Sequence, residues 1–150
     1  MVYNLLTSSQ RGFSPQEAQL GDRTVLEITD QPITPGEVIS GLDWDDRGAM
    51  VTFTGRVRSE SEEGRVVSLE HEAPREMAET LLSDLADEMR RRWDLGTIAF
   101  TYRTGPVPAG EITLVIAVVS RHRPEAFAAC QYAIDHFKQN VSAKEVLEDA

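Results

Sequence analysis

The chain has 150 residues, a formal net charge of -10 and 41% hydrophobic residues. This length suits one domain with a sizeable core, and no apolar run approaches the roughly 18 to 20 residues that span a bilayer. The acidic balance argues against nucleic acid as a partner, because phosphate contacts need a concentrated basic surface. Residues 1–19 lack the basic start and apolar core of a signal peptide, and the single Cys130 cannot form an intramolecular disulfide. The sequence therefore predicts a cytoplasmic protein without a membrane segment.

The N-terminal third predicts two short elements after an extension. Residues 1–23 are polar and weakly patterned, as in a loose extension or an edge element. The stretch "TVLEIT" (24–29) predicts a strand. Residues 34–42, "TPGEVISGL", predict a short helix, because Thr34 can cap it and a proline follows at the first helical position.

A strand that ends in two arginines is predicted at residues 48–58, "GAMVTFTGRVR". Alternation with period two puts one set of side chains on a core face and the other on an outer face. The core set is Val51, Phe53 and Val57, and the outer set is Thr52, Thr54, Arg56 and Arg58. A guanidinium is a planar fork of donors that suits phosphate or carboxylate. The two arginines are therefore either solvated or part of an anion site.

The middle of the chain predicts a second strand and a long helix. Residues 59–64 predict a charged, mobile loop, and residues 65–73 predict a strand. His71 lies on the core-leaning face of that strand, where we expect a hydrogen-bonded structural histidine. Apolar residues recur every four positions in residues 75–93, which predicts an amphipathic helix. Arginines fill its last turn, where cations favour the helix dipole.

The C-terminal half completes the pattern. Residues 97–103 and 112–120 predict strands around a turn-rich connection, and residues 121–140 predict a second long helix with Pro124 near its start. Because several connections are hairpin-like, the sequence predicts an α+β fold with a mixed or antiparallel sheet and two long helices. Residues 141–150 are short and acidic and predict a helical turn or a tail.

Basic residues gather where the last long strand meets the last long helix. The stretch "SRHRP" (120–124) places Arg121, His122 and Arg123 at a strand C-terminus and a helix N-terminus together. Backbone donors and the positive end of the helix dipole face outward there, so guanidinium and imidazole groups would complete an anion cradle. The alternative is a plain exposed loop.

The chain contains two lysines, Lys138 and Lys144. Helical spacing puts Lys138 about 20° from Phe127 and about 40° from Ile134, at the margin of the apolar stripe. Its ammonium either reaches water along its own stem or, if desolvated, loses its proton more readily and serves as a base or nucleophile. Cys130 lies on the stripe as an inert buried thiol. No pair of histidines or cysteines has metal-ligand spacing, and no glycine-rich nucleotide loop occurs, so we expect neither a metal nor a cofactor.

These segments together resemble the large, catalytic subunit of molybdopterin synthase. The matching stretches follow the family's order over residues 24–140: "GAMVTFTGRVR", "VVSLEHEA", "RRRWDLG", "YRTG", "PAGE" and "VVSRHRPEAFAACQYAIDHFK". The resemblance divides the chain into an extension (1–23), a domain similar to that subunit (24–140) and a short divergent tail (141–150).

The resemblance implies an α/β hammerhead fold and a role in molybdenum cofactor biosynthesis. Proteins of this family form a central homodimer, and each protomer binds a small ubiquitin-like sulfur carrier, which gives a heterotetramer. The carrier's C-terminal Gly-Gly ends in a thiocarboxylate. Its sulfur is delivered to cyclic pyranopterin monophosphate, which builds the dithiolene of molybdopterin.

The family's site residues correspond to four positions of this sequence, and Arg56 adjoins one of them. The pocket arginine falls on Arg58, with Arg56 beside it, the histidine–arginine pair falls on His122 and Arg123, and the first active-site lysine falls on Lys138. The resemblance implies that these side chains converge on one recess. There the basic groups would hold the substrate and Lys138 would move protons.

The C-terminal region departs from the family. Where the family has a proline and a tryptophan before a second active-site lysine, this chain reads "VSAKEVLEDA", and Lys144 lies about one position early. Two functions stay open on this ground. One is a sulfur-transferring synthase with Lys138 and Lys144 as catalytic residues, and the other is a divergent paralogue that binds the carrier with impaired turnover.

Overall fold

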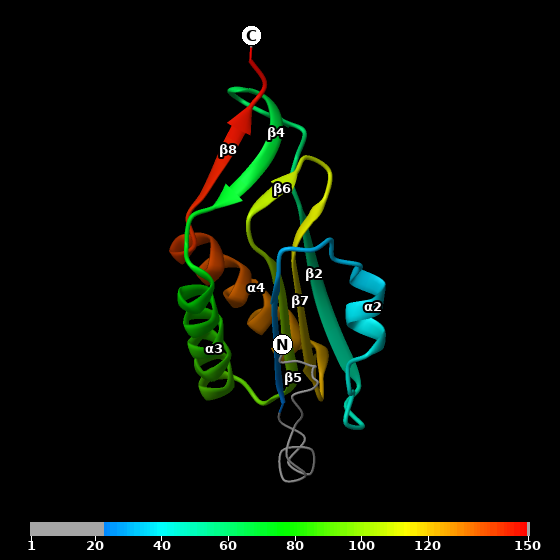
Figure 1. Cartoon of the computed structure of the whole chain (residues 1–150). Coiled ribbons are helices and arrows are strands. Elements are labelled where there is room, and N and C mark those ends of the chain that lie inside the picture. The colour runs from blue at the N-terminus through cyan, green and yellow to red at the C-terminus, as the bar shows by residue number, and fades with distance from the viewer. Residues whose placement is uncertain (1–22, 150) are drawn as a thin grey trace.

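The computed structural model describes residues 23–149, so the expectation for residues 1–22 lies outside it. A long sheet with the strand order β1-β5-β7-β2 runs through the molecule (Figure 1). Its strands are β1 (Thr24–Thr29), β5 (Leu95–Arg103), β7 (Ile112–Ser120) and β2 (Ala49–Arg56). β1 and β5 are parallel, whereas the β5–β7 and β7–β2 pairs are antiparallel. The predicted mixed sheet is confirmed.

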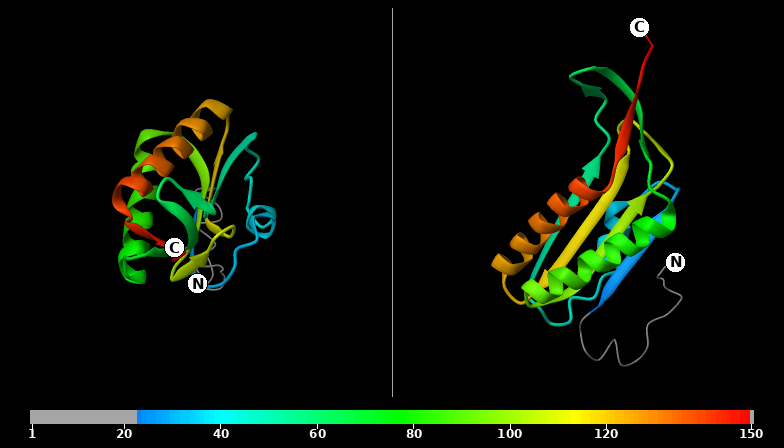
Figure 2. Two further views of the ribbon diagram at one scale, coloured as in Figure 1. Left: turned by 90° about the horizontal axis from the view of Figure 1, so that it is seen from above. Right: turned by 90° about the vertical axis from the view of Figure 1, so that its left-hand side faces the viewer.

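The two predicted long helices pack side by side on one face of this sheet. They are α3 (Arg75–Arg92) and α4 (Arg123–Asn140), and the short α2 (Pro35–Ser40) lies on the other side (Figures 1 and 2). The apolar spacing of α3 buries Leu82, Leu85 and Met89 completely or nearly so, against strand residues such as Phe100. Within residues 23–149, no helix is long and apolar enough to cross a membrane.

A second, smaller sheet lies at one end of the long sheet (Figure 1). Its central strand is β4 (Gly64–His71), which pairs with β3 (Glu60–Ser61), β6 (Pro106–Pro108) and β8 (Ala143–Leu147). This sheet has its own small core, in which Val57, Val66 and Val107 are buried. The two-layer body with a lateral sheet agrees with the α+β, hammerhead-like fold that the sequence predicts.

Three short strands of the second sheet correct the sequence-based expectations. The predicted mobile loop 59–64 contains β3, which forms a hairpin with β4, and Gly64 at the start of β4 has a φ of 139°. The turn-rich connection between β5 and β7 contains β6, and the predicted tail 141–150 contains β8. Each of these strands is defined by its pairing with β4, and a local pattern cannot predict such a partner.

The strands β2 and β7 are irregular where they approach the second sheet. Gly55 pairs with Leu114 and Arg56 pairs with Ile112, so Thr113 has no partner on β2. Such a bulge bends the strand and changes the direction of nearby side chains. β2 consequently ends at Arg56 rather than at the predicted residue 58, and Val57 turns into the second core.

Candidate active site

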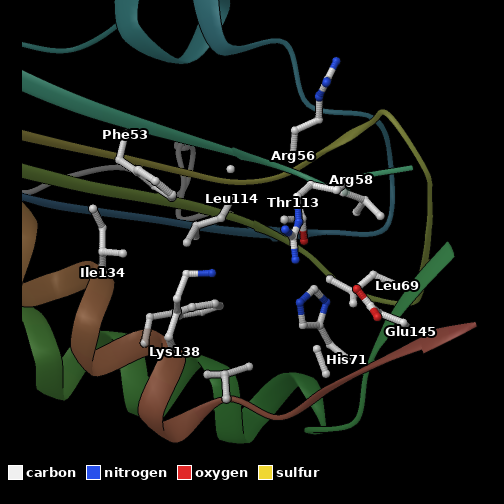
Figure 3. A pocket seen from close by; sticks show the side chains of 15 residues that line it. Phe53, Arg56, Arg58, Leu69, His71, Thr113, Leu114, Ile134, Lys138 and Glu145 are labelled. Atoms are coloured by element: carbon white, nitrogen blue, oxygen red, sulfur yellow. The ribbon is translucent and has the colours of Figure 1, made fainter. Parts of the chain in front are cut away.

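A recess with a volume of about 390 Å³ lies where the two sheets meet the end of α4 (Figure 3). Its walls come from the end of β2, the start of β7, β4, the last turns of α4 and the start of β8. The lining residues are Phe53, Gly55, Arg56, Val57, Arg58, Leu69, His71, Thr113, Leu114, Ile134, Phe137, Lys138, Val141, Ala143 and Glu145. Segments far apart in the sequence thus form one concave site.

Two of the predicted basic residues contribute to the recess from different elements. Arg58 follows β2 and Lys138 lies on the last turn of α4, whereas the guanidinium of Arg56 is directed away from the centre (Figure 3). Among the side chains of residues 23–149, neither Arg58 nor Lys138 takes part in a hydrogen bond or an ion pair. Two cations without partners in one recess are suited to an anionic ligand. Lys138 is exposed in the single chain, so its desolvation would need a bound partner.

His71 lines the recess, and its ring has the backbone hydrogen bond, with Arg103, that a structural histidine is expected to have. Its Nδ1 atom is buried without a hydrogen-bond partner, and its ring meets Tyr102 edge-on with 4.8 Å between the ring centroids. Burial, with a smaller effect from the charge of Lys138, lowers the pKa of His71 to about 4, although a hydrogen bond with the backbone of Arg103 acts in the opposite direction. The imidazole is therefore neutral at pH 7.

The lysine predicted as a second catalytic residue lies outside the recess. In the pairing of β8 with β4, Lys144 is opposite Glu70, whereas Glu145 is opposite Leu69. Because side chains alternate along a strand, Glu145 faces the recess and Lys144 faces the other side. The sequence did not single out Glu145, since it did not predict β8.

His122 and Arg123 also lie outside the recess. They mark the start of α4, where the Ser120 hydroxyl donates a hydrogen bond to the His122 carbonyl, and both side chains are exposed. Fifteen residues of helix separate Arg123 from Lys138, which is about 22 Å at 1.5 Å per residue. Within a single chain, His122 and Arg123 therefore do not converge with Arg58 and Lys138 on one recess, contrary to the sequence-based expectation.

Comparisons with known proteins agree with this architecture. The family described as MoaE protein matches residues 28–140. The chain belongs to the MoaE family. A molybdopterin synthase catalytic subunit from Thermoplasma volcanium is 41% identical over 128 residues, which cover 84% of this chain and 93% of the relative. The subunit of the same name from Bacillus subtilis is 39% identical over 126 residues, covering 83% of this chain and 80% of the relative.

Solved structures related to the MoaE family confirm the fold. Molybdopterin synthase from Staphylococcus aureus has a TM-score of 0.72 at 34% identity, covering 83% of this chain and 92% of that one. A complex of subunits 1 and 2 of molybdopterin-converting factor from Helicobacter pylori has a TM-score of 0.68 over 83% of this chain and 86% of that one. Its identity is 16%, so this likeness concerns the fold alone. The family resemblance seen in the sequence is confirmed.

Proposed function

We propose that this chain is the catalytic subunit of a molybdopterin synthase. It transfers sulfur from the thiocarboxylated C-terminus of a small ubiquitin-like carrier to cyclic pyranopterin monophosphate. The observation that carries the proposal is the recess in which Arg58 and Lys138 have no anionic partner. Both reactants are anions, since one ends in a thiocarboxylate and the other carries a phosphate. The MoaE relatives named as catalytic subunits support the same activity.

The chemistry assigns a separate task to each cation. The thiocarboxylate sulfur forms a bond to a substrate carbon while a carbon–oxygen bond of that carbon breaks, and the departing oxygen takes a proton. Water then cleaves the acyl–sulfur bond, so the carrier leaves as a carboxylate and the sulfur stays on the substrate. Arg58 holds the anionic group with its fork of donors. Lys138 supplies and recovers the proton once the carrier's tail excludes water from its ammonium.

The proposal also assigns His122 and Arg123 to the substrate, through a second copy of the chain. Both are exposed at the far end of α4, about 22 Å from Lys138. In a two-fold homodimer, this end of one protomer can lie against the recess of the other. The symmetry then forms the same contact twice, once at each recess. The imidazole of His122 and the guanidinium of Arg123 would bind the pterin's phosphate there. Cytoplasmic location stays a prediction, as does a catalytic role for Lys144, which would have to act away from this recess.

A divergent carrier-binding paralogue is the less favoured alternative. The altered C-terminal sequence motivates it, yet that sequence forms β8 and completes a wall of the recess. Both cations of the recess are present, and the relatives that cover most of the chain are named as catalytic subunits. Because the recess is formed and contains both cations, the structure favours a chain that catalyses sulfur transfer over one that only binds the carrier.

Reconstitution with a thiocarboxylated carrier and cyclic pyranopterin monophosphate tests the activity. We expect dithiolene product with the unchanged chain and a loss of about 100-fold or more in Lys138→Ala, the usual contribution of general acid–base catalysis. Lys138→Arg keeps the charge but not the proton transfer and should be similarly impaired. The matched control is Gln139→Ala, one position along the helix. Carrier binding without product in the unchanged chain would establish the binding module instead.

A further inference from the structure

The recess contains acceptors as well as cations. His71 and Glu145 line it from the paired strands β4 and β8, across from Arg58 and Lys138 (Figure 3). Glu145 takes part in no side-chain hydrogen bond or ion pair with the residues that the structure describes. Nδ1 of His71 is buried and equally without a partner. Glu145 and His71 therefore line the recess, and neither the Glu145 carboxylate nor Nδ1 of His71 accepts a hydrogen bond from within residues 23–149.

The tautomer of His71 follows from its surroundings. Burial and the nearby Lys138 keep the ring neutral, and its pKa is about 4. The hydrogen bond with the Arg103 backbone favours the protonated form, so the ring donates there. Because Nδ1 is the unpartnered atom, the donor is Nε2, and Nδ1 carries a lone pair. The charged residues that line the recess are Arg56, Arg58, Lys138 and Glu145, of which Glu145 is the single anion.

A third unpartnered group lies at the bulge. The hydroxyl of Thr113 is buried without a hydrogen-bond partner, at the position where β7 has one residue more than β2. A hydroxyl both donates and accepts, so Thr113 can serve a carbonyl oxygen or an N–H. Leaving buried polar groups unsatisfied is costly, and natural sites keep them for a ligand or a water molecule.

These groups distinguish between the two anions of the proposed reaction. A fully ionised phosphate offers acceptors and no donor, so it cannot satisfy the His71 lone pair and is repelled by Glu145. A peptide that ends in a carboxylate or thiocarboxylate offers an anion for Arg58 and Lys138. Its backbone also offers N–H donors for His71 and Glu145, and carbonyl oxygens for Thr113.

We propose that His71 and Glu145 form a seat for the backbone N–H groups of an extended peptide tail, opposite the cations that hold its terminal anion. This inference rests on the proposed function and adds to it the residues that select the tail. The phosphate of the second substrate is directed away from this wall by Glu145. His71 is a binding residue and takes no part in proton transfer.

The affinities of synthetic peptides for the chain test this proposed seat directly. The probe is an eight-residue peptide ending in Gly-Gly with a free carboxylate, compared with two analogues in which an ester oxygen replaces the last or the next-to-last amide N–H. In the unchanged full chain, at least one ester should bind about two- to tenfold more weakly, as expected for one neutral hydrogen bond. In His71→Phe, the difference should disappear for the ester that replaces the N–H bound to His71, whereas an N–H bound to Glu145 keeps its preference.

Two further variants distinguish binding from folding. His71→Asn places an amide oxygen close to the former Nδ1 position and should restore the preference for the amide. Glu145→Gln keeps an acceptor but removes the charge, so inorganic phosphate should bind more tightly while the peptide still prefers its amide form. Thermal unfolding of each variant shows whether the fold is retained.

The outcomes separate this inference from the function on which it rests. Equal binding of the amide and both esters by the unchanged chain overturns the seat and leaves the synthase proposal intact. The same holds if no amide preference is reduced in His71→Phe. Absence of any peptide binding in the unchanged chain overturns both the seat and the tail pocket.

Discussion

His71 differs from an ordinary histidine in solution, because burial and the charge of Lys138 both disfavour its protonated form. The sequence places His71 on a core-leaning face but does not show that this face borders a cavity. Lys138 could be located from its helical spacing, and the structure confirms that it lies at the edge of the apolar stripe, beside Ile134 and Phe137.

The lowered pKa of His71 predicts a pH dependence of stability. Its folded pKa of about 4 lies below the ordinary 6.5, so between these values the unfolded chain binds a proton that the folded chain does not. The stability that neutral His71 contributes is complete above pH 6.5 and is lost as the pH falls towards 4. Urea unfolding at several pH values should show a steeper loss in the unchanged chain than in His71→Asn.

A matched control isolates this effect from the titration of carboxylates. His122→Asn removes a histidine from the exposed loop before α4, and its stability should fall with pH as steeply as that of the unchanged chain. Parallel curves for the unchanged chain and His71→Asn would show that His71 does not titrate as its burial requires.

At the scale of elements, the sequence predicts what is periodic and misses what depends on a partner. The long strands and both long helices are found within two or three residues of their predicted bounds, because 3.6- and 2-residue periodicities are local. β8 and the bulge at Thr113 depend on pairing with β4 and β2, which no local pattern encodes. Glu145 was missed for that reason, although it is adjacent to the lysine that the sequence indicated.

The second sheet has a small core of its own, which predicts local opening. Val107→Ala removes two buried methyl groups from the cluster with Val57 and Val66. We expect this change to lower the free energy of unfolding by about 1.5–3 kcal/mol. We expect amide hydrogen exchange to accelerate in β4 and β8 but not in β5 and β7. Sulfur transfer should fall as well, because β4 and β8 form the wall of the recess that carries His71 and Glu145.

The control for this prediction is an equal truncation in the main core. Val118 is fully buried in the long sheet, so Val118→Ala should lower protection throughout both sheets. If Val107→Ala also accelerated exchange uniformly, the two sheets would form a single cooperative unit, and the smaller core would have no independent stability.

At the scale of the whole molecule, basic groups occupy both ends of an elongated, acidic chain. The formal net charge is -10, yet residues 49–123 contain ten arginines, and Arg58 and Lys138 share one recess. The loop with His122 and Arg123 lies at the opposite end of β7, seven residues from the bulge, which is about 23 Å along a strand. Local basic surface on an acidic protein attracts anions to defined places.

Mixing two inactive variants tests whether these ends meet across a homodimer. In a two-fold dimer, a site that takes Lys138 from one protomer and Arg123 from the other is defective in both pure variants, Lys138→Ala and Arg123→Ala. Random exchange between equal amounts gives hetero-dimers in which one site has both defects and the other has none. Sulfur transfer should therefore recover to about a quarter of the unchanged activity. If activity did not recover, although mass spectrometry verified the exchange of protomers, Arg123 would not act across the dimer. The control is a mixture of Lys138→Ala and Arg58→Ala. It should stay inactive, because those two side chains share one recess within a single chain.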